Sequence, residues 1–119
     1  MLSLRGKARS QGKNIVIIMS AKKFIVTEHN AQGRLVLAVC DKKIHGKKFE
    51  DNNAVLDLNS KFFNGHEKWT EEVEKLMRQS YTINAAGKNS VNFTIKLGLA
   101  SNPDVKKVAG TPHVHVLMP

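Results

Sequence analysis

Six consecutive apolar residues, Leu-Val-Leu-Ala-Val-Cys at positions 35–40, limit the folds that this chain can adopt. The run is rich in β-forming residues and follows a short loop that contains Asn and Gly, so it predicts a strand. Alternate side chains of a strand point to opposite faces, so a strand that is apolar at every position is buried on both faces. We therefore expect a β-sheet in which residues 35–40 form a central strand.

The rest of the chain predicts further strands and the loops between them. Residues 24–28 alternate in hydrophobicity, and the turn residues His29–Gly33 join them to the central strand as a hairpin. Additional strands are expected over 54–58, 105–108 and 113–117. Loops are expected over 59–65 and 82–88, and Gly87 is free to adopt a positive φ.

Two segments with helical spacing complete the pattern. Residues 70–81 predict an amphipathic helix that packs on the sheet, with the apolar residues Trp69, Val73, Leu76, Met77 and Tyr81. Thr70 is its expected N-cap. A second helix is expected over 90–97, between a cap at Asn89 or Ser90 and a stop at Gly98. The predicted fold class is α+β: a small mixed or mainly antiparallel sheet covered by two helices.

Size and composition limit the class of protein. A length of 119 residues allows one domain, which we place at 22–119 after a basic extension at 1–21. A single cysteine, Cys40, excludes an internal disulfide and a four-cysteine zinc site, and it fits a reducing cytosol. No apolar run approaches the ~18–20 residues of a membrane helix. We expect a soluble, cytoplasmic protein without a membrane partner.

The basic extension has three open interpretations. In the first, residues 1–18 are an upstream addition to the true reading frame, because residues 19–23 (Met-Ser-Ala-Lys-Lys) resemble a natural start. In the second the extension is a real arm, disordered alone and ordered on its partner, and in the third it is a targeting segment. The apolar run at 15–19 is short for a secretory signal, and Gly6 and Gly12 interrupt a transit-peptide helix.

Positive charge gathers at both ends of the sequence. Six Lys and Arg residues precede Glu28, the first acidic residue, and six more follow from Lys75 onward against Asp104 alone. The middle, 28–74, holds seven bases and nine acids. Such a distribution in a small chain of net charge +9 is typical of a protein that binds a polyanion.

Clustered lysines favour RNA as that polyanion. One lysine pair is usually solvated surface, but the chain has three, at 42–43, 47–48 and 106–107, besides its acid-free start. Phe62, Phe63 and Trp69 are able to stack on unpaired bases, but we expect them in the core because only seven aromatic residues are available to fill it. Without a ribonucleoprotein-type aromatic motif, recognition of structured RNA by shape and phosphate is the better fit.

Catalytic and metal sites have weaker support. Cys40 and His113 are candidates for a nucleophile pair, but a cysteine that ends an apolar strand is more often a buried, inert thiol. His113 and His115 lie on one face of a predicted strand, yet the sequence offers no third metal ligand at a compatible spacing. We expect no catalytic residue, no metal and no cofactor.

An ordered set of short motifs resembles a known family. The chain carries Val39-Cys40-Asp41, Gly46-Lys47-Lys48-Phe49, Phe63-Asn64-Gly65, Asn84-Ala85-Ala86-Gly87 and Gly110-Thr111-Pro112-His113. In that order, over about 22–117, they resemble the archaeal family catalogued as domain of unknown function four-twenty-four. The resemblance implies a single α+β domain without an assigned enzymatic activity. The domain also occurs fused to the beta subunit of archaeal initiation factor 2, which implies a role in translation and association with the ribosome.

Charge and resemblance together predict a non-enzymatic protein that binds ribosomal or other structured RNA in the archaeal translation machinery. The expected RNA-binding residues are Arg5, Lys7, Arg9, Lys13, Lys22, Lys23, Lys42, Lys43, Lys47, Lys48, Asn84, Lys88, Lys106, Lys107 and His113. Two alternatives stay open: an adaptor that docks to a protein such as an initiation factor, and a small hydrolase that uses Cys40 and His113.

Overall fold

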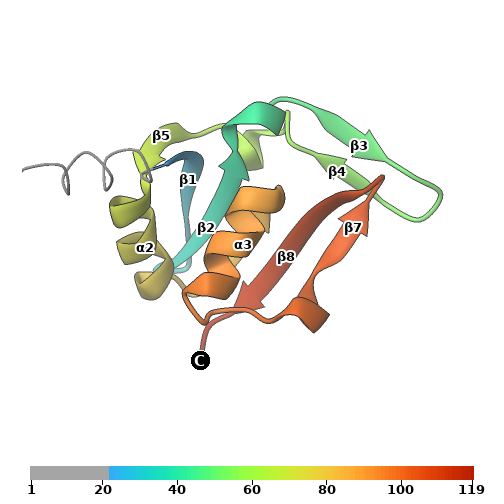
Figure 1. Ribbon diagram of the computed structural model, residues 1–119. Helices are drawn as coiled ribbons and strands as arrows, with labels where there is room; N and C mark the ends of the chain where they lie inside the picture. Colours follow the sequence, from blue (N-terminus) through green and yellow to red (C-terminus); the bar gives the residue numbers. More distant parts are fainter. Residues whose placement is uncertain (1–21) are drawn as a thin grey trace, which may run out of the picture.

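The computed structural model describes residues 22–119 as a mixed six-stranded sheet, a small two-stranded sheet and two helices (Figure 1). The main sheet has the order β5-β1-β2-β6-β8-β7. Its strands are β1 (Lys23–Ala31), β2 (Arg34–Asp41), β5 (His66–Trp69), β6 (Thr82–Ala86), β7 (Lys106–Val108) and β8 (Thr111–Leu117). The other elements are β3 (Lys48–Glu50), β4 (Val55–Asp57), α2 (Thr70–Gln79), α3 (Lys88–Lys96) and the 3₁₀ turns η2 (Lys42–Ile44), η3 (Lys61–Phe63) and η4 (Asn102–Asp104).

The strand directions confirm the predicted α+β class. Strands β2 and β6 run parallel, whereas the β1–β2, β1–β5, β6–β8 and β7–β8 pairs are antiparallel. The parallel pair requires a crossover between β2 and β6, and this crossover contains the small sheet, β5 and α2.

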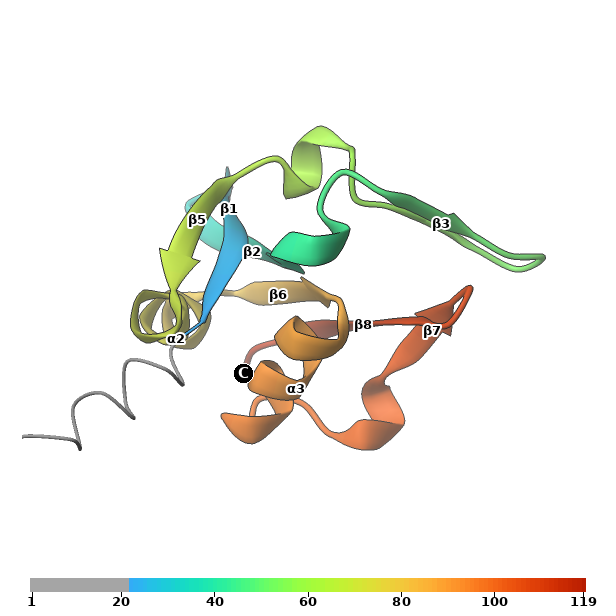
Figure 2. The same ribbon diagram turned by 45° about the horizontal axis from the view of Figure 1, so that its top comes forward.

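Both faces of β2 are buried, as its unbroken apolar run predicts. On one face Leu37 and Val39 join a core cluster with Val73 and Met77 of α2 and Val91 of α3. On the other face Ala38 and Cys40 pack with residues of the crossover: Leu56, Leu58 and Phe63. The two helices therefore cover one face, and the small sheet with η3 covers part of the other (Figure 2).

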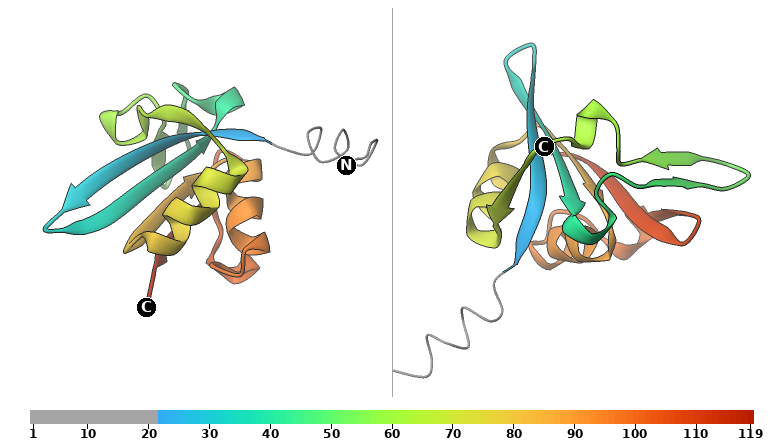
Figure 3. Two further views of the ribbon diagram at one scale, coloured as in Figure 1. Left: turned by 90° about the vertical axis from the view of Figure 1, so that its left-hand side faces the viewer. Right: turned by 90° about the horizontal axis from the view of Figure 1, so that it is seen from above.

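The β1–β2 hairpin is longer than the sequence predicted. The strands pair from Phe24↔Asp41 to Ala31↔Arg34, so the turn is two residues rather than the five expected at His29–Gly33. Both turn residues, Gln32 and Gly33, have positive φ (56° and 79°), the conformation that matches the twist of two paired strands. The hairpin tip projects beyond the rest of the sheet (Figure 3).

Three strands were missing from the prediction: β3, β5 and β6. Residues 82–86, expected to be a loop, form β6, which is hydrogen-bonded between β2 and β8. Its Asn and Ala residues have low β propensity, so pairing on both sides decides its conformation. Residues 66–69, for which no strand was expected, form β5 on the outer side of β1. The predicted closing strands are confirmed as β7 and β8.

The helices are confirmed, but their ends differ from the prediction. Helix α2 spans Thr70–Gln79 and its N-cap is Trp69, so Thr70 is already helical. Trp69 and Tyr81 are exposed rather than packed on the sheet. Helix α3 begins at Lys88, and its N-cap is Gly87 instead of Asn89 or Ser90.

Candidate nucleic-acid interface

Two lysine pairs that are almost twenty residues apart in the sequence meet at one end of the β1–β2 hairpin. Phe24 pairs with Asp41, which places the start of β1 beside the end of β2. Lys22 and Lys23 immediately precede Phe24, and Lys42 and Lys43 immediately follow Asp41. All four lysines line one pocket of about 210 Å³, together with Phe24, Asp41 and Asn89. Strand pairing thus converts two ordinary lysine pairs into one cluster.

The carboxylate of Asp41, which also lines this pocket, is hydrogen-bonded to a helix. Asp41 is 8% exposed, and its oxygens accept hydrogen bonds from the Asn89 and Ser90 amides (2.9 and 2.7 Å) and the Ser90 hydroxyl (2.6 Å). These amides belong to the first turn of α3, where the helix dipole favours an anion. Asp41 is therefore the cap of α3, supplied from a distant strand.

Gly87 makes this arrangement possible. Its backbone has φ 103° and ψ 156°, a region that is essentially restricted to glycine. A Cβ added at Gly87 would lie 2.5 Å from the Cγ of Asp41. The carboxylate therefore occupies the space that any other side chain at position 87 would need.

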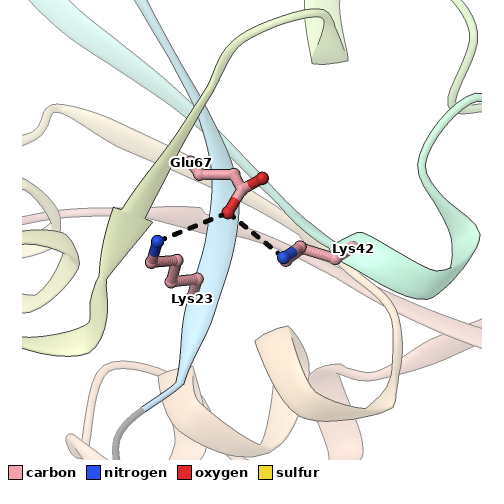
Figure 4. A network of polar contacts seen from close by, with 3 residues as sticks. All are labelled: Lys23, Lys42 and Glu67. Atoms are coloured by element: carbon pink, nitrogen blue, oxygen red, sulfur yellow. Dashed lines mark ion pairs between the residues drawn. The ribbon is translucent and has the colours of Figure 1, made fainter.

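One exposed carboxylate partly offsets the lysine cluster. Glu67 of β5 lies 3.1 Å from the Nζ of Lys42 and 3.7 Å from that of Lys23 (Figure 4). The hydrogen bond from Lys42 and, to a smaller extent, the charge of Lys42 lower the pKa of Glu67. The carboxylate therefore stays ionised at pH values at which a free glutamate begins to be protonated. Within residues 22–119, Lys22 and Lys43 form no ion pair, so the cluster keeps a net positive charge.

A second basic pocket adjoins the first at the start of α3. It has a volume of about 580 Å³, and its polar lining residues are Lys88, Lys107, Asn92 and Asn102. Its apolar lining comes from Val91, Ile95, Val105 and Pro112. Because Lys88 lines this pocket and its neighbour Asn89 lines the first, the N-terminus of α3 lies between the two.

We call the lysines of both pockets the lysine stripe: Lys22, Lys23, Lys42, Lys43, Lys88 and Lys107. Four separate segments supply them: the start of β1, η2, the start of α3, and β7. In the described part of the chain, Asp41 is the one carboxylate that lines either pocket, and α3 already holds it. The stripe is a run of positive charge across one end of the sheet.

The predicted pair Lys47–Lys48 lines neither pocket. Lys48 is the first residue of β3, and Lys47 precedes it; β3 and β4 form an arm that Figure 3 shows extending from the main sheet. Lys48 pairs with Asp57 in the strand register, and Glu50 and Asp51 follow on the same arm. These three acidic residues offset the two lysines, so the arm does not extend the positive surface.

Asn84, Lys106 and His113 also line neither pocket. Asn84, expected in a loop, is a partly buried residue of the central strand β6. Lys106 and His113 are paired across β7 and β8, and Lys106 is adjacent to Lys107 on a strand, so the two lysines point to opposite faces. Burial, with the nearby charge of Lys106, lowers the pKa of His113. Arg5, Lys7, Arg9 and Lys13 lie outside the described residues.

Cys40 has the properties of a structural thiol. It is fully buried, its Sγ donates to the Asp41 carbonyl at 3.3 Å, and burial with the charge of Asp41 raises its pKa to about 12. A nucleophilic cysteine needs a lowered pKa. Within residues 22–119, no three His, Cys, Asp or Glu side chains are grouped as metal ligands would be. The described region also contains no helix long and apolar enough to cross a membrane.

Sequence reasoning missed the three asparagines that line the two pockets: Asn89, Asn92 and Asn102. Their spacing gave one signal, because Lys88, Asn92 and Ile95 recur at three and four residues on one face of α3. Asn102 carried no comparable signal, since the fold alone brings η4 to this pocket.

Comparison with known proteins defines the family. The family model described as Protein of unknown function (DUF424) matches residues 29–118, most of the chain. This chain belongs to the DUF424 family. A crystal structure described as an uncharacterized conserved protein from Methanopyrus kandleri is similar to this DUF424 protein, with a TM-score of 0.67 and 23% identity. The likeness covers 82% of this chain and 95% of the other, and it shows a shared fold. No curated protein matches.

Proposed function

We propose that this DUF424 protein binds structured RNA through its lysine stripe and serves the archaeal translation machinery as a ribosome-associated protein. The observation that carries the RNA-binding part is the convergence of six lysines on two adjoining pockets, with one lining carboxylate that already caps α3. The part concerning translation is supported by the family resemblance.

Phosphate binding is the chemistry that such a surface favours. Each lysine that neutralises a phosphate releases condensed counterions, which makes affinity strong at low salt and independent of sequence. Exposed ammonium groups on flexible stems suit a polyanion, whose charges are spread along a backbone. The two pockets also face one end of the sheet from neighbouring segments, so one RNA backbone can cross both.

Two double variants of equal charge test the proposal. Lys42→Ala with Lys43→Ala removes two stripe lysines, whereas Lys47→Ala with Lys48→Ala removes two from the arm. Binding to a paired RNA hairpin, measured by fluorescence anisotropy at 50 mM salt, is expected to weaken about tenfold or more for the first pair and little for the second.

Both pairs are exposed, so unchanged circular dichroism serves as the folding control. Equal losses of RNA affinity in the two double variants would show that affinity depends on net charge and not on the position of the lysines. Unchanged affinity for the stripe variant would contradict the proposal and favour the adaptor alternative, in which the lysines only maintain solubility.

A further inference from the structure

We propose that Trp69 forms, together with the adjoining lysines of the stripe, a subsite for an unpaired nucleotide. The base stacks on the indole, and its phosphates lie against Lys22 and Lys23. This inference rests on the proposed function, and it adds a preference for RNA with an unpaired segment beside a helical stem.

The exposure of Trp69 is the first observation. Trp69 is the single tryptophan of the chain, and 51% of its surface is exposed. A chain with seven aromatic residues would stabilise its core by burying this one, yet Trp69 lies on β5 at the edge of the sheet. An exposed indole indicates a binding role more than a packing role.

The position of Trp69 is the second observation. It is directly opposite Lys23 in the β1–β5 register, and the Nζ of Lys23 is 4.5 Å from its ring centroid. The amide of the next residue, Thr70, donates to the carbonyl of Lys22 at 3.0 Å. The indole therefore lies next to two lysines of the first pocket. A nucleotide whose phosphate binds these lysines can reach it with its base.

The chemistry of single-stranded RNA matches this pairing of groups. Proteins that bind unpaired nucleotides combine a basic groove along the backbone with aromatic rings on which bases stack. Lys23 links the two parts, because it lines the pocket and its ammonium lies over one face of the ring, which leaves the other face for the base in this proposal. Such stacking tolerates any base, so the subsite would recognise an unpaired nucleotide without reading its identity.

A second exposed aromatic residue gives a matched control. Tyr81 is 39% exposed, and the Arg34 guanidinium lies 4.3 Å from its ring centroid, so it repeats the cation–aromatic pair of Trp69. Its amide donates to the carbonyl of Leu35, near the opposite end of β2 from Asp41. Leu35 is six positions from Asp41 along the strand, so Tyr81 lies roughly 20 Å from the stripe.

The test uses two RNA hairpins of identical stem, one blunt and one with three unpaired nucleotides at an end. Titrated into the full-length protein, the second hairpin is expected to quench the fluorescence of the single tryptophan, whereas the blunt hairpin leaves it nearly unchanged. By anisotropy, the wild-type protein is expected to bind the second hairpin about tenfold more tightly.

Substitutions complete the test. Trp69→Leu is expected to remove the tenfold preference and leave binding of the blunt hairpin intact, while Tyr81→Leu keeps the preference. If both hairpins bind equally, with salt-dependent affinity and unchanged fluorescence, this inference is wrong and the proposed function stands. If neither hairpin shows salt-dependent binding, the proposed function fails as well.

Discussion

At the scale of single residues, Gly87 and Asp41 form the most demanding contact of the site. Any side chain at position 87 meets both a glycine-only backbone conformation and the Asp41 carboxylate. We expect Gly87→Ala to lower the free energy of unfolding by about 3 kcal/mol or more. Urea denaturation measures the loss.

Gly46 is the matched control for that substitution. It also has a positive φ, 86°, but an added Cβ would meet no atom within 4 Å. Gly46→Ala is expected to lower the free energy of unfolding by only about 1–2 kcal/mol, because it introduces backbone strain without a steric clash. Equal losses at the two glycines would show that Asp41 gives way easily and does not depend on Gly87.

The thiol of Cys40 makes stability depend on pH in the alkaline range. Its pKa is raised from 9.0 to about 12 in the folded protein, so above pH 9 the unfolded chain loses a proton that the folded chain keeps. The folded state therefore loses stability as pH rises from 9 towards 12, by about 1.4 kcal/mol per unit for one such group.

Comparison with Cys40→Ala isolates this effect, because every other titrating group is common to both proteins. Between pH 8 and pH 10.5, the wild-type free energy of unfolding is expected to fall about 2 kcal/mol further than that of the variant. Parallel pH profiles would mean that folding leaves the pKa of the thiol unchanged, which contradicts its burial as an inert group.

At the scale of secondary structure, the β1–β2 hairpin controls the site because it brings the two lysine pairs together. Its turn places Gln32 at φ 56°, a conformation that Asn tolerates better than Gln. We expect Gln32→Asn to raise the free energy of unfolding by about 0.5–1 kcal/mol in a thermal or urea melt. The control Gln79→Asn, in the last turn of α2, should not raise the free energy of unfolding. If Gln32→Asn instead lowers the free energy of unfolding, this turn geometry is wrong.

Local sequence patterns predicted some elements and not others, for physical reasons. The unbroken apolar run 35–40 and the helical spacing after Thr70 determine their own conformations, and both were predicted well. In contrast, Thr82–Ala86 has no strand pattern of its own, and it becomes β6 because β2 and β8 flank it. Trp69 followed the helical spacing of α2, but its place opposite Lys23 in β5 could not be inferred from that spacing.

At the scale of the whole molecule, the site could be predicted only in part. All six lysines of the stripe were among the predicted RNA-binding residues, because basic residues and their clusters can be read directly from the sequence. The sequence alone gave Lys47 and Lys48 the same weight, since Asp57, the acidic residue opposite Lys48 on the arm, is brought close only by strand pairing. The cap of α3 by Asp41 joins residues nearly fifty positions apart, and no local pattern reveals it.

The distribution of charge in the folded molecule supports one binding surface over a general positive charge. Four of the 19 Lys and Arg residues and none of the ten acids precede residue 22, so the described residues hold 15 bases and ten acids. Much of the acidic charge lies on the arm and along α2. Apart from the six lysines of the stripe, the described residues therefore carry nearly equal numbers of basic and acidic side chains.

The most direct test of the lysine stripe is the salt dependence of its affinity for RNA. For a paired RNA hairpin between 50 and 200 mM salt, the logarithm of the wild-type binding constant is expected to fall linearly with the logarithm of salt concentration. Replacing Lys42 and Lys43 by alanine should reduce that slope by about 1.5, and replacing Lys47 and Lys48 should leave it unchanged. A wild-type affinity that stays flat across this range, or equal slopes for both variants, would contradict phosphate binding by the stripe.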